Sequence, residues 1–360
     1  MGENHQTLKN SIANRILQIG SRVLVWGGLL YIVYILRTFS LLIFLTFIFS
    51  YIQNSFIKRV QTKIKSRNIA AVISFCLFIF IVSAIGVLLV PKIKDQAKLF
   101  IDRYPLYVSS LDSYLLTTID KYPSLKDLVP QLNVPGESIT TKIFQHLLEG
   151  EAGSVGFAFS RVTTLWVYVT STASAFFLSI LFSFLIILDF DNLKKGVTNL
   201  KKSRIAFIYD EVSEGIFNFA SVMGRAMEAQ LVIAIINAFL TAFGLVALGF
   251  TEKIIFLSTI VFICSFIPVA GVFISSVPIC LVALQESGLN LMLLSILMIT
   301  VIHIIEAYII NPRIYGHHMK MNPVIVLIIL TVGGKLFGVW GLVLGVPVCN
   351  YLFRHAIRSK

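Results

Sequence analysis

Long apolar runs without a charged residue constrain this chain more than any other feature. Several of them approach 20 residues, which is enough for a helix to cross about 30 Å of hydrocarbon. Inside a bilayer a helix satisfies its own backbone hydrogen bonds. The composition agrees, because 57% of the 360 residues are hydrophobic, 13% are charged and the mean hydropathy is +0.86. Soluble domains carry about 25% charged residues, so the sequence predicts an all-α polytopic membrane protein.

The chain contains eight hydrophobic segments. They cover residues 16–36, 38–57, 69–90, 162–188, 230–248, 254–284, 291–310 and 323–352. We expect about six full spans, with a tight turn at Arg37 between the first two and an end at Pro91 for the third. Segments 254–284 and 323–352 are interrupted by Pro or Gly, and we predict that each forms a broken, re-entrant helical hairpin.

The basic residues predict the orientation in the membrane. The net charge is +12, and Lys and Arg gather in residues 58–67 and 194–204, directly beside apolar segments. Basic loops remain on the cytoplasmic side, so both termini are expected in the cytoplasm. Topology explains this charge better than binding of nucleic acid does. The four cysteines lie inside apolar segments and are expected to be core residues rather than disulfides or metal ligands.

Three regions follow from this pattern. Residues 1–90 hold an N-terminal cytoplasmic tail and three spans. Residues 91–160 mix acidic and basic residues with helical apolar spacing and with prolines at positions 105, 123, 130 and 135, which predicts a small helical extracytoplasmic insertion. Residues 161–360 form the expected core, with a cytoplasmic amphipathic segment at 190–228.

Charge also favours the two hairpins. If 254–284 reverses at Pro268–Val–Ala–Gly271, the next helix runs inward and the basic loop after Arg313 is cytoplasmic. The tip of the second hairpin is predicted near Gly333, Gly334 and Lys335. Eight plain spans are the alternative, and they would place that basic loop outside. Spaced glycines in 334–345 permit close helix packing, and a homo-oligomer is expected.

Glu306 is the main candidate for a functional residue, since a carboxylate in an apolar helix is costly and tends to handle a proton, cation or substrate. His303 is one turn away and could share a proton with it. Arg313 and Lys335 are candidate counter-charges, and a purely structural ion pair is the alternative reading. Further candidates along the substrate path or at helix breaks are Gln230, Asn237, Pro268, Gly271, Gly333, Gly334, Asn311 and Pro312.

At these residues the chain resembles the autoinducer-2 exporter (AI-2E) family of bacterial inner-membrane proteins. The resemblance is carried by Ile267–Gly271, Ile305–Glu306 with Asn311–Pro–Arg–Ile–Tyr–Gly316, Asn322–Pro323 and Gly333–Gly–Lys–Leu–Phe–Gly338. It differs from the family at Ala229, where Gly is usual, and at His303, where Gln is common. The resemblance implies secondary export of small signalling molecules, and some members are thought to be cation/proton antiporters.

The leading functional prediction is therefore a secondary transporter that exports a small polar, autoinducer-2-like molecule across the inner membrane. A monovalent cation/proton antiporter is the alternative, and a membrane scaffold without transport is a third reading. The sequence contains no Walker motif, no nucleophile–base arrangement and no metal-ligand spacing. We accordingly expect no enzyme activity, cofactor or metal site, and the lipid bilayer and a small molecule or ion as partners.

Overall fold

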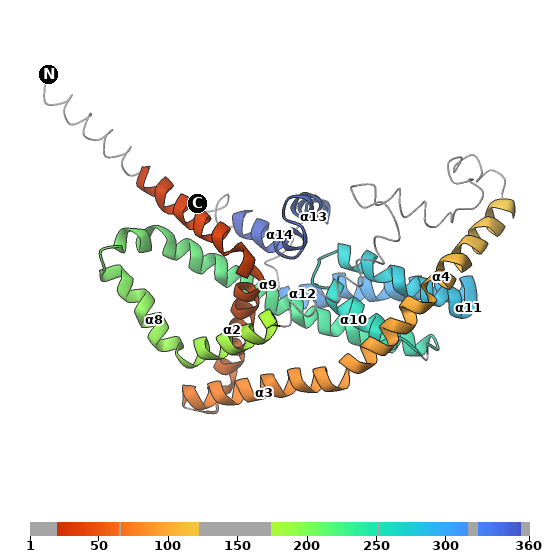
Figure 1. Ribbon diagram of the computed structural model, residues 1–360, viewed down its shortest axis with the longest axis horizontal. Helices are drawn as coiled ribbons and strands as arrows, with labels where there is room; N and C mark the ends of the chain where they lie inside the picture. The colour runs from red at the N-terminus through yellow and green to blue at the C-terminus, as the bar shows by residue number, and fades with distance from the viewer. Residues whose placement is uncertain (1–19, 65, 122–173, 251, 316–322, 354–360) are drawn as a thin grey trace, which may run out of the picture. The chain divides into compact units, whose positions relative to one another are not determined.

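The computed structural model describes residues 20–64, 66–121, 174–250, 252–315 and 323–353. Every regular element in these ranges is a helix (Figure 1). Within them, 4 helices are long and apolar enough to cross a membrane, or 5 if one bent helix pair is counted as a span. The all-α, multi-pass prediction is confirmed, whereas the predicted number of six full spans is not.

Three shorter apolar helices, Ile254–Cys264, Val324–Phe337 and Trp340–Leu352, lie in the two segments predicted as broken hairpins. The first of them has 11 residues. At about 1.5 Å per residue, such a helix reaches roughly half-way across the hydrocarbon layer. The second segment is therefore built from helices that are too short to span individually, whereas the first joins such a helix to the start of the longer helix Ala270–Ile305.

The described chain groups into two compact units. The N-terminal unit contains residues 20–78 and 174–225, and the core unit contains residues 79–121 and 226–353. The boundaries fall inside two helices, α3 (Arg67–Leu88) and α9 (Ala206–Ala247).

The N-terminal unit begins with two helices joined by a bend. A helix over residues 20–35 leads into the 3-10 helix η1 (Leu36–Phe39), and α2 (Ser40–Val60) follows. The backbone at both ends of η1 has helical dihedral angles. The tight reversal predicted at Arg37 is therefore wrong, because a 3-10 turn continues the right-handed path of the chain.

Helices α2, α3 and Ser174–Leu188 pack against one another in this unit. Their shared apolar layer consists of Ile57, Ala70, Ala71 and Ile187, all almost fully buried. After Leu188 the chain bends by 74° into α8 (Phe190–Asn199), and η3 (Leu200–Lys202) follows. Lysines of α8 and η3 carry the second basic cluster noted in the sequence.

Helix α9 is continuous over 42 residues. The sequence predicted an amphipathic segment ending near residue 228 and a separate span from Gln230. The structure corrects this, because the six residues from Arg225 to Gln230 are all favourable in helices and none of them breaks the chain.

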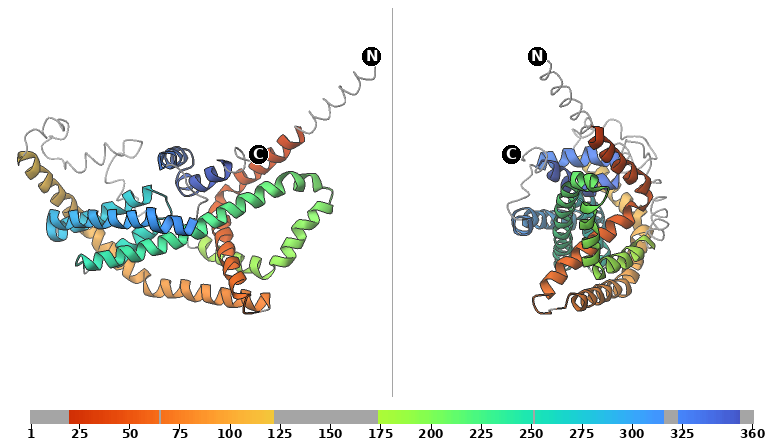
Figure 2. Two further views of the ribbon diagram at one scale, coloured as in Figure 1. Left: turned by 180° about the vertical axis from the view of Figure 1, so that it is seen from behind. Right: turned by 90° about the vertical axis from the view of Figure 1, so that its left-hand side faces the viewer.

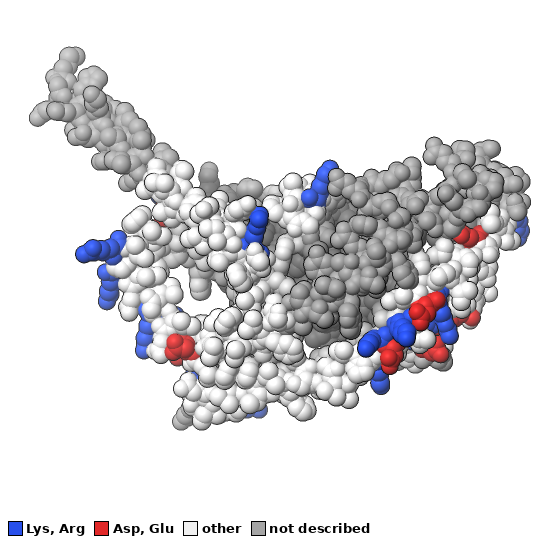
Figure 3. All heavy atoms as spheres, in the orientation of Figure 1, with Lys and Arg blue, Asp and Glu red and all other residues white. Residues whose placement is uncertain are grey.

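Helix α4 (Val90–Lys121), which is the described part of the predicted insertion, belongs to the core unit. Pro91 does not end the preceding helix abruptly. It lies in the first turn of α4, where the missing N–H of proline is tolerated. Pro105 lies within this helix. Basic and acidic side chains intermingle along α4, as Figure 3 shows. Residues 122–160 of the predicted insertion lie outside the described residues.

The first hairpin reverses at the predicted position. Helix α10 (Ile254–Cys264) ends before Pro268, and α11 (Ala270–Ile305) begins just after it. Val269 between them has a positive φ of 64°. Gly271 permits the close return, because a Cβ at that position would overlap the carbonyl oxygen of Cys264.

Helix α11 consists of two helical parts. Ser287 (φ −147°) and Gly288 (φ 72°) have non-helical dihedral angles, so the helix is interrupted between Glu286 and Leu289. Figure 1 shows the chain turning back near the α11 label. The part after Gly288 corresponds to the predicted span 291–310.

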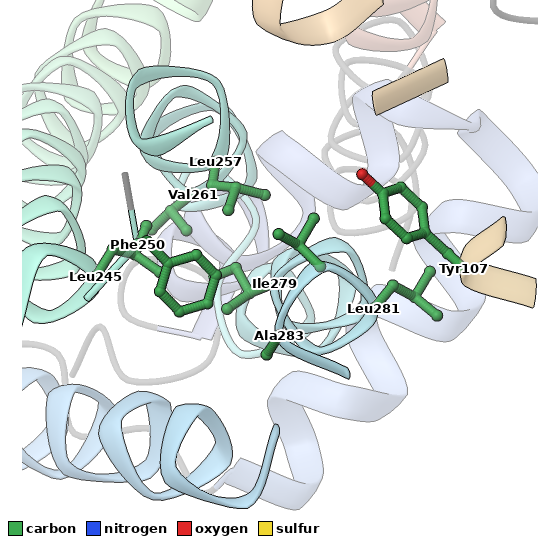
Figure 4. Close-up of a cluster of buried hydrophobic side chains, with 9 residues drawn as sticks. Tyr107, Leu245, Phe250, Leu257, Val261, Ile279, Leu281 and Ala283 are labelled. Atoms are coloured by element: carbon green, nitrogen blue, oxygen red, sulfur yellow. The ribbon is translucent and has the colours of Figure 1, made fainter. Parts of the chain in front are cut away.

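The core of this unit lies where α4, the end of α9 and the first hairpin meet (Figure 4). Leu245, Leu257 and Val282 are fully buried there, together with Tyr107 of α4. The backbone N–H of Phe256 donates a hydrogen bond of 2.9 Å to Oε1 of Gln96, also on α4. Helix α4 thus supplies both an apolar and a polar contact to the start of α10.

The second hairpin comprises α13 (Pro323–Phe337) and α14 (Val339–Leu352), which lie side by side (Figure 2). The reversal occurs at Gly338 (φ 58°, ψ −137°), a conformation that strongly favours glycine. The tip predicted at Gly333–Lys335 is therefore misplaced, because these residues are helical within α13. Gly333 instead faces Gly341 so closely that no side chain fits between the two backbones.

We predict that Gly341→Ala destabilises the second hairpin, because the new Cβ would overlap the carbonyl group of Gly333. Overpacking of this kind costs about 1–3 kcal/mol. Thermal unfolding of the purified protein in detergent should show a lower midpoint. Gly86→Ala in α3 is the matched control, since nothing lies within 4 Å of the Cβ it would add. Equal midpoints for the two variants would contradict the predicted close contact.

Candidate functional site

A small cavity in the core unit collects polar side chains from four elements. Its volume is about 30 Å³, and roughly 10–15 Å³ on this measure holds one water molecule. The lining residues are Asn237, Thr241, Val261, Ser265, Val272, Ser275, Ile279, Ile299, Ile302, His303 and Glu306. Helices α9, α10 and α11 supply most of these residues, and Glu306 comes from the turn after α11.

Glu306 and Asn237 form the central contact of the cavity. Nδ2 of Asn237 donates a hydrogen bond of 2.9 Å to Oε2 of Glu306. Its second donor contact is to Oγ of Ser265, at 3.4 Å. Asn237 is 3% exposed, and its Oδ1 atom has no hydrogen-bond partner among the described residues. A carboxylate and an unpartnered amide oxygen are therefore enclosed at the same place.

The local backbone positions Glu306 at an irregular turn. Residues Glu306–Ile310 form the π-helix η4, and the N–H of Asn311 bonds to the carbonyl of Glu306. The helix break predicted at Asn311–Pro312 is absent, because the chain continues as α12 (Asn311–Tyr315). The wider π turn gives room for the ring of Pro312, which would crowd the preceding turn of an α-helix.

His303 lies one turn before Glu306, as predicted. Its Nδ1 atom is 3.8 Å from Oε2 of Glu306. This nitrogen has no hydrogen-bond partner in the described part of the chain. The imidazole is therefore placed to interact with the carboxylate when it is protonated.

Ser265 connects the cavity to the break in the first hairpin. Its hydroxyl donates 2.7 Å to the carbonyl oxygen of Val261, and its own carbonyl accepts a hydrogen bond from Nε2 of Gln230. Gln230 does not line this cavity. It lies with Pro268 at a smaller one of about 10 Å³. Gln230 thus supports the broken backbone, while Asn237, about two turns farther along the same face of α9, reaches the carboxylate.

The two proposed counter-charges are placed differently. Arg313 lies on α12 and Lys335 on α13, and both are exposed. Among the ion pairs between described residues, neither pairs with Glu306. Gly333 and Gly334 lie beside α14 rather than at the cavity. The structure therefore brings together Glu306, His303 and Asn237, but it does not add the two basic residues.

Sequence reasoning missed a buried ion pair at the other end of the first hairpin. Nζ of Lys253 is 3.3 Å from Oε1 of Glu286 and 3.8 Å from Oε2 of Glu252, and the Lys253 side chain is fully buried. Arg103 of α4 lies 3.8 Å from Glu252. The available signal was the pair of isolated charges, Lys253 and Glu286, at nearly equal distances from the break at Pro268.

The hydroxyl residues of the cavity were also missed. Thr241 follows Asn237 by one turn on α9, so both lie on one face. Ser265 and Ser275 stand on either side of the hairpin break. Serine and threonine are common in membrane helices, and these three became distinctive only when the fold placed them around one carboxylate.

Comparison with known proteins identifies several similar chains. A model of the AI-2E family of transporters matches residues 23–354. The chain is 29% identical to "Putative transport protein YdbI" of Bacillus subtilis over 194 residues, which are 54% of this chain and 55% of that protein. It is 27% identical to "Putative transport protein YrrI" of the same organism over 217 residues, 58% of each chain. The chain thus spans little more than half the length of these two relatives.

A further relative matches along nearly the whole chain. A "Sodium-lithium/proton antiporter" of Halobacillus andaensis is 22% identical over 347 residues, which are 93% of this chain and 94% of that protein.

The buried ion pair generates a stability prediction. Lys253→Met should lower the free energy of unfolding by about 3 kcal/mol, because it leaves Glu286 without its cation in a largely buried site. The double variant Lys253→Met/Glu286→Met should recover most of this loss. Arg103→Met is the control, since its pair with Glu252 is about half exposed. Denaturation of the purified protein measures all of them, and a double variant as unstable as the single one would contradict the pairing.

Proposed function

The chain belongs to the AI-2E family of transporters, and we propose that it exchanges a monovalent cation for protons at Glu306. The observation that carries this proposal is the enclosed carboxylate, with an amide and three hydroxyl groups around a cavity of about 30 Å³.

The polar atoms around Glu306 suit a hard cation. Carboxylate, amide and hydroxyl oxygens are the ligands that alkali and alkaline-earth ions prefer. The unpartnered Oδ1 of Asn237 is available as one ligand. Oε2 of Glu306 is close to it, because the Nδ2 atom of the same amide group donates a hydrogen bond to this carboxylate oxygen. A carboxylate binds either a proton or a cation, so occupancy by one excludes the other. This competition is the elementary requirement of an antiporter.

The size of the cavity supports the same choice. It holds about two water molecules on the scale given above. Pockets for organic ligands are usually several hundred Å³. In this conformation the site accommodates an ion with a remaining water more readily than an organic solute.

The end of α10 adds a favourable electrostatic contribution. The C-terminus of a helix carries a partial negative charge, and α10 ends at Cys264, one residue before the cavity-lining Ser265. Broken helices that direct carbonyl ends at a cation are a recurring feature of secondary transporters. The relative named a sodium-lithium/proton antiporter supports sodium and lithium as the first ions to test.

Export of a small polar, autoinducer-2-like molecule is the second candidate. The observation in its favour is the pair of broken hairpins, which contain short apolar helices. Movement of either hairpin would enlarge the path for an organic solute. A scaffold without transport would not require a carboxylate surrounded by hydrogen-bonding groups.

We further propose that the protein lies in the bacterial inner membrane with both termini in the cytoplasm. The lysines of α8 and η3 support this orientation, as basic segments remain inside. In a cysteine-free background, Lys195→Cys should react with an impermeant thiol reagent only after cells are opened. Ser113→Cys, near the end of α4, should react in intact cells. Labelling of both positions in intact cells would contradict the orientation.

The coupling residue is tested by Glu306→Gln, which retains the shape and a hydrogen-bond acceptor for Asn237 but removes the charge. In proteoliposomes that hold a pH gradient, sodium or lithium should dissipate the gradient with the unmodified protein, and Glu306→Gln should abolish the response. His303→Gln should retain exchange with an altered pH profile, because it removes the titratable neighbour 3.8 Å away.

Glu214→Gln is the matched control, since Glu214 is an exposed carboxylate on α9 far along the helix from Asn237. It should exchange normally. If Glu306→Gln dissipates the gradient as fast as this control, Glu306 does not couple transport. A response to none of the alkali ions, together with export of a labelled polyol that Glu306→Gln abolishes, would favour the second candidate.

A further inference from the structure

The N-terminal unit encloses a second set of polar side chains that the proposed cation site does not use. Thr46 and Gln53 of α2 are 8% and 2% exposed, and Ser74 of α3 is 3% exposed. Ser179 and Ser183, on helix Ser174–Leu188, are fully buried. Five of the buried residues of this three-helix bundle are therefore polar, in segments that otherwise consist mainly of Leu, Ile and Phe.

These residues form a continuous column rather than scattered positions. On α2, Thr46, Ser50 and Gln53 recur at the spacing of one helix face. Nε2 of Gln53 donates 3.1 Å to Oγ of Ser183, which places these two side chains at one level. About one turn away along α2, the ring of Phe49 packs against the rings of Phe78 and Phe176, with centroid distances of 5.2 and 5.4 Å. Ser50 is next to Phe49 and Ser179 is one turn after Phe176, so these two serines form the next level of the column.

Three atoms of the column are buried without a hydrogen-bond partner among the described residues. They are Oγ1 of Thr46, Oγ of Ser50 and Oε1 of Gln53. A buried polar atom without a partner is costly, and each one calls for an explanation such as a bound molecule. The hydroxyls of Ser179 and Ser183 donate only to carbonyl groups of their own helix, Phe176 and Ile180.

Association of the helices does not require this column. Polar residues can join membrane helices through hydrogen bonds, but within the column only Gln53 and Ser183 are joined by one. Thr46 and Ser50 make no such bond through their hydroxyl oxygens. Aliphatic side chains of similar volume would pack the bundle without the cost of the unpartnered atoms.

An apolar layer and an ion pair both cover one end of the column. The apolar layer of Ile57, Ala70, Ala71 and Ile187 comes directly after Gln53 and Ser183 along the bundle. Beyond it, the guanidinium of Arg67 lies 3.2 Å from Oδ1 of Asp191 and is 3.4 Å from Oδ1 of Asn54. Arg67 also covers the ring of Phe190 at 4.5 Å. The polar side chains of the column therefore lie behind an apolar layer and an ion pair.

We propose that this column is a passage for small neutral hydroxylated molecules, water included, which fills when the three helices separate. Its lining offers hydroxyl and amide groups and, within the column itself, no charged side chain, so it suits a neutral molecule rather than an ion. Water or a polyol would supply partners for the three unpartnered atoms. This passage is independent of the cation site, because it lies in the other unit and shares no residue with it.

The test measures solute entry into proteoliposomes that contain the purified full-length chain. After mixing with a glycerol gradient, the rate of reswelling is followed by light scattering. The triple variant Thr46→Val/Ser50→Ala/Gln53→Leu should reduce the protein-dependent rate to that of liposomes without protein. Its thermal stability should not fall, because the substitutions remove unpartnered buried atoms. Sodium-driven dissipation of a pH gradient should continue, which separates this result from failure at Glu306.

A second variant opens the passage instead of closing it. Ile57→Ala removes most of one of the two isoleucine side chains in the apolar layer and should raise the rate of reswelling above that of the unmodified protein. Ser276→Ala is the control, since its hydroxyl bonds only to a carbonyl of its own helix in the core unit. The proposal is overturned if the unmodified protein and the triple variant both match empty liposomes, or if Ile57→Ala has no effect on the rate.

Discussion

A broken helix in an apolar environment must find partners for its free backbone groups, and the rest of this structure depends on that constraint. The break after α10 leaves the carbonyl of Ser265 outside the regular helix, and Gln230 of α9 donates a hydrogen bond to it. The same helix presents Asn237 to Glu306 about two turns later. One uninterrupted helix thus stabilises the irregular backbone and also holds the carboxylate, so the support of the fold and the chemistry of the site share a single element.

Local sequence signals predicted the features that depend on local chemistry. Apolar length predicted the membrane helices, and Pro268 with Gly271 predicted the first reversal, because a proline ends a helix and a nearby glycine permits a tight return. The second reversal was misplaced. Several glycines in this segment could each have formed the turn. Only the three-dimensional packing shows that Gly333 permits contact between the two helices, whereas Gly338 adopts the positive φ of the turn.

The candidate site was predicted in part, and the reason is again physical. A lone carboxylate in an apolar segment is unusual enough to identify Glu306 from sequence, and its neighbour His303 follows from helical spacing. The partner of Glu306 could not be chosen by charge, since a neutral amide, Asn237, holds it in place of Arg313 or Lys335. Lys253 was overlooked for the converse reason, because its burial arises from a contact between distant segments.

The π turn at Glu306–Ile310 has a consequence for the helix that follows it. Such a turn contains one residue more than the α-helical turn it replaces, and each residue rotates a helix by about 100°. The side chains of α12 are therefore out of phase with those of α11. Deletion of a single residue from this turn would restore a uniform helix and swing Arg313 to a different side. The orientation of the side chains of α12 is thus determined by the length of one turn.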